Sequence, residues 1–264
     1  MTVMKIVTWN LNHRAGRIGS TPEKMKIIAE ALTILDADII VLTEYVPNKK
    51  YHDLFENSLK RIGYTDVLIS KYYSKINDVQ NQILIASRLP LKEGSIFPPD
   101  HPVDGVRNNI FHVTMGSLGI IGLRMPLFSG NQKKDQIPVI SHPWWEWVIQ
   151  TARENLNCPF IFIGDFNCDL VRKTKDNGLR LEQLTREGWT HAIPKDSSVK
   201  SFYSKPESKG STIDHAFLSP QLVLKKTDFI LQKGSYHFAK HEDALSDHAV
   251  LMVEFDLPKG ESTS

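Results

Sequence analysis

Residues 159–167 read PFIFIGDFN, an unbroken apolar run that ends in a carboxylate, Asp165, and an amide, Asn167. Successive side chains of a strand point to opposite faces, so this strand is apolar on both faces and is expected to be covered on both. Gly164 lets the backbone leave the sheet, and loops at strand ends commonly carry functional residues. If the extended spacing continues, Asp165 and Asn167 point the same way. The alternative is an ordinary turn, because Asp and Asn favour turns.

The same construction, an apolar strand with polar side chains at one end, recurs at four other places. These are residues 4–12 with Asn10 and Asn12, residues 37–44 with Glu44, residues 211–219 with Asp214 and His215, and residues 249–255, which follow Asp247 and His248. Active sites collect where such strands end, so we expect these polar side chains to share one pocket.

The polar side chains at these strand ends are mainly hard oxygen donors. Such donors suit Mg²⁺ or Mn²⁺, which keep water in their shell and take one or two carboxylates together with substrate phosphate. Zinc fits poorly, because Cys158 and Cys168 lack paired spacing and no two histidines flank a glutamate at helical ligand spacing. The sequence therefore predicts a Mg²⁺ or Mn²⁺ site.

In their order along the chain, these five motifs resemble those of the endonuclease/exonuclease/phosphatase superfamily. These metal-dependent phosphodiesterases include pancreatic-type deoxyribonucleases and apurinic endonucleases. The resemblance runs from Lys5 to Phe255, and residues 81–90 (NQILIASRLP) are similar to a family strand that ends in Ser-Arg/Lys-x-Pro. It implies an α/β fold, a four-layer sandwich in which two packed, mainly antiparallel sheets are flanked by helices. The excess of strands and hairpin-like connections favours the same architecture.

The resemblance also implies residues for the metal and the substrate. Asn10 and Glu44 would bind the metal ion, with Asp247 close to it or bridging to it. Asn12 is expected to contact the substrate.

The resemblance further implies that Asp165 and Asn167 orient the attacking water and the scissile phosphate. His248, held by Asp214, would contact phosphate oxygens or assist proton transfer. Phosphodiester hydrolysis needs a hydroxide, neutralised phosphate oxygens and help for the leaving alkoxide, which one metal with an Asp/Asn/His set can supply. A neighbouring carboxylate raises a histidine pKa and would keep His248 cationic near neutral pH. Taken by itself, a histidine such as His248 is more often a buried core imidazole, but its place beside Asp247 and after another Asp-His pair favours the functional role.

One position departs from the family pattern. Many members have His or Tyr at the end of a mid-chain strand, where residues 120–126 (IIGLRMP) place Arg124. Arginine can clamp a phosphate bidentately, but its pKa is too high for proton shuttling. We therefore expect Arg124 to be an electrophilic clamp, with a surface arginine at a strand end as the alternative.

Four helices are predicted from apolar periodicity. The first begins at residues 20–23, where Ser20 and Glu23 have capping-box spacing, and the others cover residues 48–61, 142–155 and 175–187. Tryptophans of the third helix are expected in the core rather than in a substrate-stacking platform. Residues 92–109 and 130–143 are rich in helix breakers and are expected to form irregular loops that set substrate choice.

Basic residues follow the Asp165 motif closely: Arg172, Lys173 and Lys175. Their spacing predicts contact with a nucleic-acid backbone at the rim of the cleft, with a solvated surface loop as the alternative. The net charge of +2 is too near zero to demonstrate a polyanionic partner.

The motifs span the 264 residues, so we expect one catalytic domain over residues 1–257 and a short flexible tail over 258–264. With two cysteines and no leader-like segment, a secreted disulfide protein is not expected. No apolar run approaches the ~18 residues that span a bilayer. We expect a cytoplasmic enzyme without membrane contact, and the oligomeric state stays open.

Three functions remain after these arguments. The first is a divalent-metal nuclease that cleaves DNA or RNA. The second is a phosphodiesterase or phosphatase for a small ester such as a nucleotide, a phosphoinositide or a lipid head group, although residues 211–219 lack the Cys-Asp-Arg sequence of the inositol branch. The third, a catalytically silent binding module, is disfavoured because no catalytic position carries an inert side chain.

Overall fold

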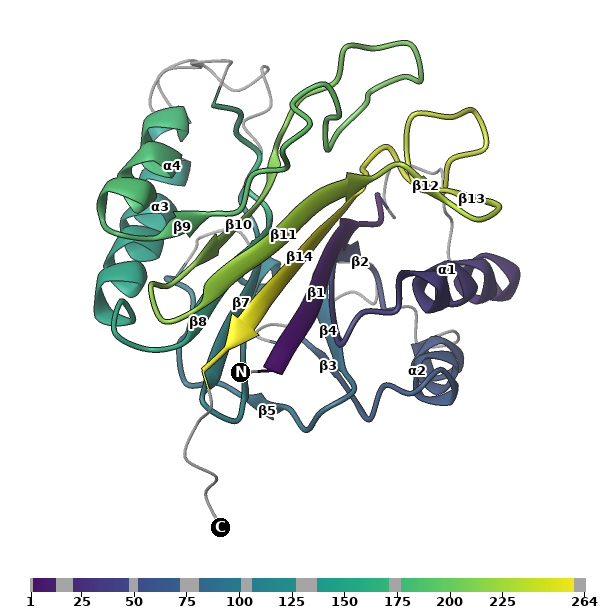
Figure 1. Ribbon diagram of the computed structural model, residues 1–264, viewed down its shortest axis with the longest axis horizontal. Coiled ribbons are helices and arrows are strands. Elements are labelled where there is room, and N and C mark those ends of the chain that lie inside the picture. Colours follow the sequence, from purple (N-terminus) through teal and green to yellow (C-terminus); the bar gives the residue numbers. More distant parts are fainter. Residues whose placement is uncertain are drawn as a thin grey trace.

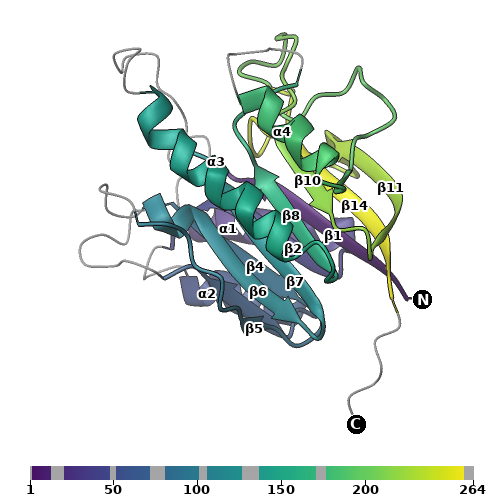
Figure 2. The same ribbon diagram turned by 90° about the vertical axis from the view of Figure 1, so that its left-hand side faces the viewer.

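The computed structural model describes residues 2–12, 21–47, 52–71, 81–100, 106–126, 137–170 and 177–258. These residues form a four-layer α/β sandwich, in which two mixed six-stranded sheets pack face to face between two pairs of helices (Figure 1). Figure 2 shows the same layers after a quarter turn. The predicted fold is confirmed.

The first sheet has the strand order β11-β14-β1-β2-β4-β3. Its strands are β1 (Thr2–Asn10), β2 (Ile39–Tyr45), β3 (Asp66–Ile69), β4 (Gln82–Ser87), β11 (Val223–Ile230) and β14 (Val250–Leu257). Only β1 and β2 are parallel neighbours among these strands; the other described pairs are antiparallel.

The second sheet has the order β5-β6-β7-β8-β10-β9. Its strands are β5 (Lys92–Glu93), β6 (Ile110–Met115), β7 (Leu118–Arg124), β8 (Phe160–Asp165), β9 (Thr190–His191) and β10 (Asp214–Leu218). Here β7 and β8 are the parallel pair within the described residues. The 3-10 helix η2 (Val106–Asn109) and the small hairpin of β12 (Gln232–Lys233) and β13 (Tyr236–His237) lie outside the two sheets.

Strand β8 is buried on both faces, as its sequence predicts. Ile161 and Ile163 belong to the core between the two sheets. Phe160 and Phe162 belong to a second core on the outer face of the same sheet. This strand therefore fixes the stacking of three layers at the point where Asp165 emerges.

Helices α1 (Pro22–Leu35) and α2 (His52–Arg61) cover the outer face of the first sheet, and α3 (Ile137–Glu154) and α4 (Asn177–Arg186) cover that of the second (Figure 1). Trp144 and Trp145 of α3 are each only 1% exposed, and Trp147 packs against the same core. The tryptophans are core residues rather than a stacking platform, as predicted. No helix in the described ranges has the length and apolar character needed to cross a bilayer.

Helix α1 begins at Pro22, within the predicted residues 20–23, but its predicted capping box is wrong. The N-cap of α1 is Thr21, whose Oγ1 accepts a hydrogen bond from the backbone N of Lys24 at 3.3 Å. Because Pro22 takes the first helical position, Glu23 is one residue too early for a capping box with Thr21. Ser20 lies outside the described residues.

Helix α3 begins at Ile137, so it includes the end of the segment 130–143 that was predicted as a loop, and Pro143 lies inside it. A proline there removes one helical hydrogen bond, but the turn that follows is anchored in the core by Trp144, Trp145 and Val148. Packing thus outweighs the local signal.

Other predicted ends differ less. Helix α4 lies within residues 175–187, and α2 is described from His52 because residues 48–51 lie outside the described part. Strand β10 starts at Asp214 instead of residue 211, since Ser211 forms only an isolated bridge with Phe202. The predicted tail, beyond residue 258, lies outside the described residues.

Candidate active site

The ends of the two parallel strand pairs carry four of the predicted site residues. Asn10 ends β1, and Glu44 lies near the end of β2. Arg124 ends β7 and Asp165 ends β8, where they are directly paired in register. The antiparallel neighbours of these pairs begin at the same edges, which brings Asp214 and the residues before β14 to the site.

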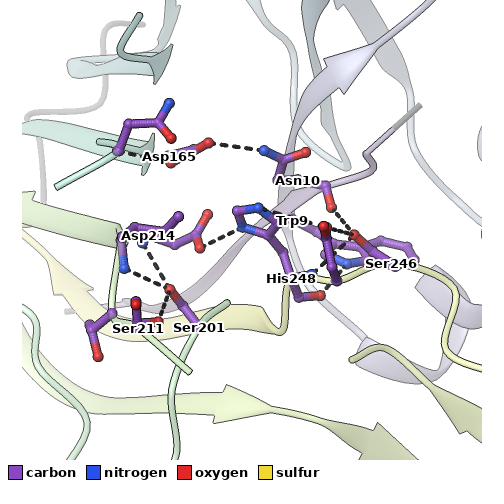
Figure 3. Close-up of polar contacts among 12 residues, drawn as sticks. Trp9, Asn10, Asp165, Ser201, Ser211, Asp214, Ser246 and His248 are labelled. Carbon is purple, nitrogen blue, oxygen red and sulfur yellow. Dashed lines mark hydrogen bonds and ion pairs between the residues drawn. The ribbon is translucent and has the colours of Figure 1, made fainter. Parts of the chain in front are cut away.

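Hydrogen bonds join the two sheets at this edge. Asn10 Nδ2 donates to Asp165 Oδ2 at 3.0 Å (Figure 3). It also donates to Glu44 Oε1 at 3.3 Å. Arg124 Nε donates to the same Glu44 Oε1 at 2.7 Å. Two of these contacts, Asn10–Asp165 and Arg124–Glu44, join one sheet to the other. The four side chains form one connected group.

The turns after β1 and β8 have the same local structure. The backbone N of Asn12 donates to Asn10 Oδ1, and the backbone N of Asn167 donates to Asp165 Oδ1, both at 2.9 Å. Asn12 and Asn167 have positive φ angles of 48° and 51°. The extended spacing expected after Asp165 therefore does not continue. The Asp165 side chain instead accepts a hydrogen bond from the turn that follows it, and Asn167 Nδ2 donates to the carbonyl of Met125 at 2.5 Å.

Gly164 is required by the backbone at the end of β8. Its φ angle is 146°, and a Cβ atom would lie 1.9 Å from the carbonyl oxygen of Leu123 on β7. Only a residue without a side chain lets β8 deliver Asp165 so close to the neighbouring strand.

His248 and Asp214 form a buried pair, with His248 Nδ1 2.8 Å from Asp214 Oδ2 (Figure 3). The backbone on either side of the imidazole is held by long-range contacts. Trp9 Nε1 donates to the carbonyl of His248 at 2.9 Å, and Ser246 Oγ accepts from His248 N at 3.1 Å while donating to the carbonyl of Asn10 at 2.7 Å. The site end of β1 and the start of β14 are therefore locked together.

Ser201 was missed by the sequence analysis. Its Oγ accepts from the backbone N of Ile213 at 2.9 Å and of Asp214 at 3.0 Å, and its carbonyl accepts from Ala249 N at 2.7 Å. The residue thus connects the starts of β10 and β14 and fixes Asp214 relative to His248. A loop serine has no distinguishing local pattern, so only the long-range pairing reveals this role.

The buried charges shift the pKa values of the site in a connected way. Burial raises the pKa of Asp165 to about 7, and the nearby carboxylate of Asp214 adds to the shift against the positive charges of His248 and Arg124. Burial lowers the pKa of His248, but Asp214, followed by Asp165 and Asp247, outweighs burial and raises this pKa to about 9. Near neutral pH, His248 is cationic and Asp165 can exchange a proton.

The other Asp-His sequence, Asp214-His215, does not add a second imidazole to the site. His215 Nε2 lies 2.9 Å from the carbonyl of Cys168, and its Nδ1 lies 3.0 Å from Nε2 of His191. Burial lowers the pKa of both imidazoles. His215 is therefore a neutral, hydrogen-bonded core residue, while its neighbour Asp214 faces the site.

Asp247 and the basic residues complete the comparison with the sequence. Asp247 Oδ1 lies 3.8 Å from His248 Nε2, and its side chain is 18% exposed, so it sits at the rim. Arg172, Lys173 and Lys175 lie outside the described residues. The structure thus brings the other predicted side chains to one edge and leaves the basic loop untested.

The oxygen donors fit a hard divalent cation. Both hydrogen bonds to Glu44 fall on Oε1, so its Oε2 has no hydrogen-bond partner among the described residues, and the side chain is 12% exposed. The described residues contain no group of three or more His, Cys, Asp or Glu side chains arranged around a metal position. Mg²⁺ does not need such a cage, because one or two carboxylates with water and substrate phosphate suffice. Glu44 and Asn10, with Asp247 nearby, would hold it.

The amino-acid sequence and the fold both have known relatives. Residues 7–248 match the model of the Endonuclease/Exonuclease/phosphatase family. A comparison with curated proteins finds no significant match.

Several solved structures share the fold at low sequence identity. An AP endonuclease from Archaeoglobus fulgidus is 19% identical with a TM-score of 0.69, covering 96% of this chain and 100% of its own. A 3′ phosphatase, NExo from Neisseria bound to a product DNA hairpin, is 19% identical with a TM-score of 0.69, covering 96% and 99%. The human Nocturnin catalytic domain with bound sulfate is 16% identical with a TM-score of 0.63, covering 96% and 93%. The family match spans most of the chain and both sheets, so this chain belongs to the endonuclease/exonuclease/phosphatase family.

Proposed function

We propose that this chain is a divalent-metal-dependent phosphodiester hydrolase that cleaves DNA or RNA by attack of water on phosphorus. The observation that carries the proposal is the buried Asp214–His248 pair, which lies where the strand ends of both sheets meet. Members of the family are hydrolases, nucleases and phosphatases among them, and generally use divalent metals.

A bound Mg²⁺ or Mn²⁺ supplies Lewis-acid neutralisation of phosphate oxygens and activation of water. Asp165 is suited to take the proton of the attacking water, because its pKa of about 7 matches neutral pH. Asn167, in the same turn, helps to orient that water and the scissile phosphate. His248, cationic and held by Asp214, stabilises negative charge on a phosphate oxygen.

Two further side chains contact the substrate in this proposal. Arg124, whose guanidinium lies beside Glu44, donates to a phosphate oxygen. Asn12, next to the Asn10 turn, contacts the substrate at the rim. Arg172, Lys173 and Lys175 contact backbone phosphates farther from the cleavage point.

Nucleic acid is the preferred substrate because an AP endonuclease and a DNA-bound 3′ phosphatase share the fold over nearly the full length. The alternative is a small phosphate ester such as a nucleotide, a phosphoinositide or a lipid head group. It is favoured by the concentration of cationic groups, His248 and Arg124, around one point.

The free cysteines Cys158 and Cys168 fit a reducing compartment, and we place the enzyme in the cytoplasm.

The test compares nucleic acids with small esters. Plasmid nicking and cleavage of labelled DNA and RNA oligonucleotides are measured beside phosphate release from nucleotides, inositol phosphates and phosphorylated head groups, each with Mg²⁺, Mn²⁺ or chelator. We expect metal-dependent cleavage of nucleic acid that is lost in Asp165→Asn. Turnover of small esters alone would select the alternative substrate class. A folded protein without turnover on any substrate would contradict the proposal of a hydrolase.

A further inference from the structure

The guanidinium of Arg124 is bonded to the carboxylate that would bind the metal. Arg124 Nε lies 2.7 Å from Glu44 Oε1, and the two side chains are only 14% and 12% exposed. The contact joins the end of β7 in one sheet to β2 in the other. Asn10 Nδ2 donates to the same oxygen at 3.3 Å, so Glu44 Oε1 accepts from two donors.

This arrangement places a permanent positive charge at the metal position. The guanidinium of Arg124 carries a full positive charge, so it competes with a metal ion for the carboxylate of Glu44. Two cations beside one carboxylate repel each other. Because Arg124 and Glu44 are mostly buried, salt screens this repulsion only weakly. Glu44 Oε2 has no hydrogen-bond partner among the described residues, but a divalent ion bound there would lie beside the guanidinium, so we expect tight binding only once the guanidinium moves away.

We infer that Arg124 is a resident counter-ion of Glu44, which a divalent cation must displace. The site then binds metal weakly, and the displaced guanidinium becomes available to the substrate phosphate. This inference deepens the proposed function and rests on its metal position.

A different interpretation is that the Arg124–Glu44 contact is a fixed structural bridge between the sheets. A fixed bridge predicts that removing Arg124 leaves metal affinity unchanged or weakens it by disturbing Glu44. Displacement predicts the opposite sign, because the competitor has been removed. The direction of the change in metal affinity therefore separates the two.

The experiment titrates Mn²⁺ into the metal-free full chain and follows free Mn²⁺ by electron paramagnetic resonance. We compare wild type with Arg124→Gln, Arg124→Met and Arg124→Lys. The two neutral variants are expected to bind Mn²⁺ at least about tenfold more tightly, since a competing charge is gone. Arg124→Lys keeps the charge and is expected to lie closer to wild type. Equal or weaker binding by the folded neutral variants overturns the inference.

The matched control is Arg180→Gln, because Arg180 also pairs with a glutamate, Glu146, at 2.6 Å but on the α3/α4 layer. It is expected to leave Mn²⁺ affinity unchanged. Far-UV circular dichroism and thermal melts identify the folded variants, and Arg124→Met replaces Arg124→Gln if the latter does not fold.

A second comparison tests whether the effect runs through Glu44. In a Glu44→Gln background, Arg124→Gln is expected to give no gain in Mn²⁺ binding, because there is no carboxylate to compete for. An equal gain in that background would mean general charge repulsion and would overturn displacement from Glu44. These titrations need no turnover, so their failure is distinguishable from failure of the proposed hydrolase activity.

Discussion

The turn after β1 and the turn after β8 share one backbone design but carry different chemistry. In both, the first side chain accepts a hydrogen bond from a backbone N two residues later, and an asparagine with positive φ follows. In the first sheet the accepting residue is the neutral Asn10. In the second it is Asp165, whose pKa is raised by burial. The fold places two equivalent polar groups, and the choice of side chain decides which one can move a proton.

The second strands of the two parallel pairs differ even more. Strand β2 contributes the negative Glu44 and β7 the positive Arg124, and the two side chains bond to each other across the sheets. Each half of the site is therefore incomplete by itself. One half supplies Glu44, the carboxylate proposed to bind a metal ion, and the other supplies Asp165 and the guanidinium of Arg124.

The largest expected effect comes from removing the metal carboxylate. Glu44→Ala, or chelation of the wild type, is expected to abolish turnover, because Glu44 is the one carboxylate among the β1 and β2 ends described here. The melting temperature reports whether the fold is intact, and Glu146→Ala serves as a control on an exposed arginine partner. Undiminished turnover in folded Glu44→Ala would remove the proposed metal site.

Asp165→Asn makes the two turns chemically alike and is the sharpest test of their difference. Turnover is expected to fall about 10³-fold, within the range for loss of a positioned base. The turn itself should persist, since an amide oxygen can still accept from Asn167 N. Measuring kcat together with the melting temperature at pH 8 checks both statements. A variant with wild-type kcat would show that Asp165 has no proton-transfer role.

The pair of His248 and Asp214 predicts a pH dependence whose sign can be worked out. The folded-state pKa of His248, about 9, lies above its usual value of 6.5, so the stabilisation is fully present below pH 6.5 and is lost as pH rises through 9. Activity that needs the cation falls over the same alkaline range. Asp165, with a pKa of about 7, gives the acidic limb, because its base form disappears below that pH.

Asp214→Asn is expected to lower the pKa of His248, because it removes the strongest influence that opposes burial. The alkaline limb of the pH–rate profile should move to lower pH, and kcat should fall by roughly 10², the lower range for a positioned acid or base. His248→Ala is expected to cost more than Asp214→Asn. The pH profiles of wild type and Asp214→Asn are the measurement, and superimposable profiles would argue against the pairing.

The sequence predicted the fold and the set of strand ends because both depend on local patterns. An apolar run such as residues 159–163 followed by Gly164 and Asp165 signals a buried strand and its exit within a few residues. Contacts between distant segments leave no such signal. Arg124 and Glu44 are 80 residues apart, and Ser201 acts through backbone groups of β10 and of the segment before β14.

Two of the wrong predictions concerned helix starts, where neighbouring residues offered similar signals. Thr21 and Ser20 can both cap a helix, and Pro143 can start one. The core contacts of Trp144 and Trp145 carry α3 through the proline, and that packing is not visible locally.

The smallest expected effect separates the two asparagines of the matching turns. Asn12 and Asn167 both hold positive φ angles, which cost an alanine about 1 kcal/mol in either place. Asn167 also donates its Nδ2 to the carbonyl of Met125, and no hydrogen bond from the Asn12 side chain to another described residue matches it. Asn167→Ala is therefore expected to lower the free energy of unfolding by about 1 kcal/mol more than Asn12→Ala.

Glycine variants separate backbone strain from the lost hydrogen bond. Glycine accepts positive φ readily, so Asn12→Gly is expected to be close to wild type, whereas Asn167→Gly keeps the cost of the lost bond to Met125. Urea unfolding of all four variants gives the free energies. Equal losses at the two positions, in alanine and in glycine, would mean that the Met125 contact adds nothing and that the turns are equivalent in stability as well as in backbone. A larger loss of unfolding free energy at Asn167 than at Asn12 would show that the turn after Asp165 is held more firmly. Such a turn would keep the carboxylate of Asp165 in a fixed position.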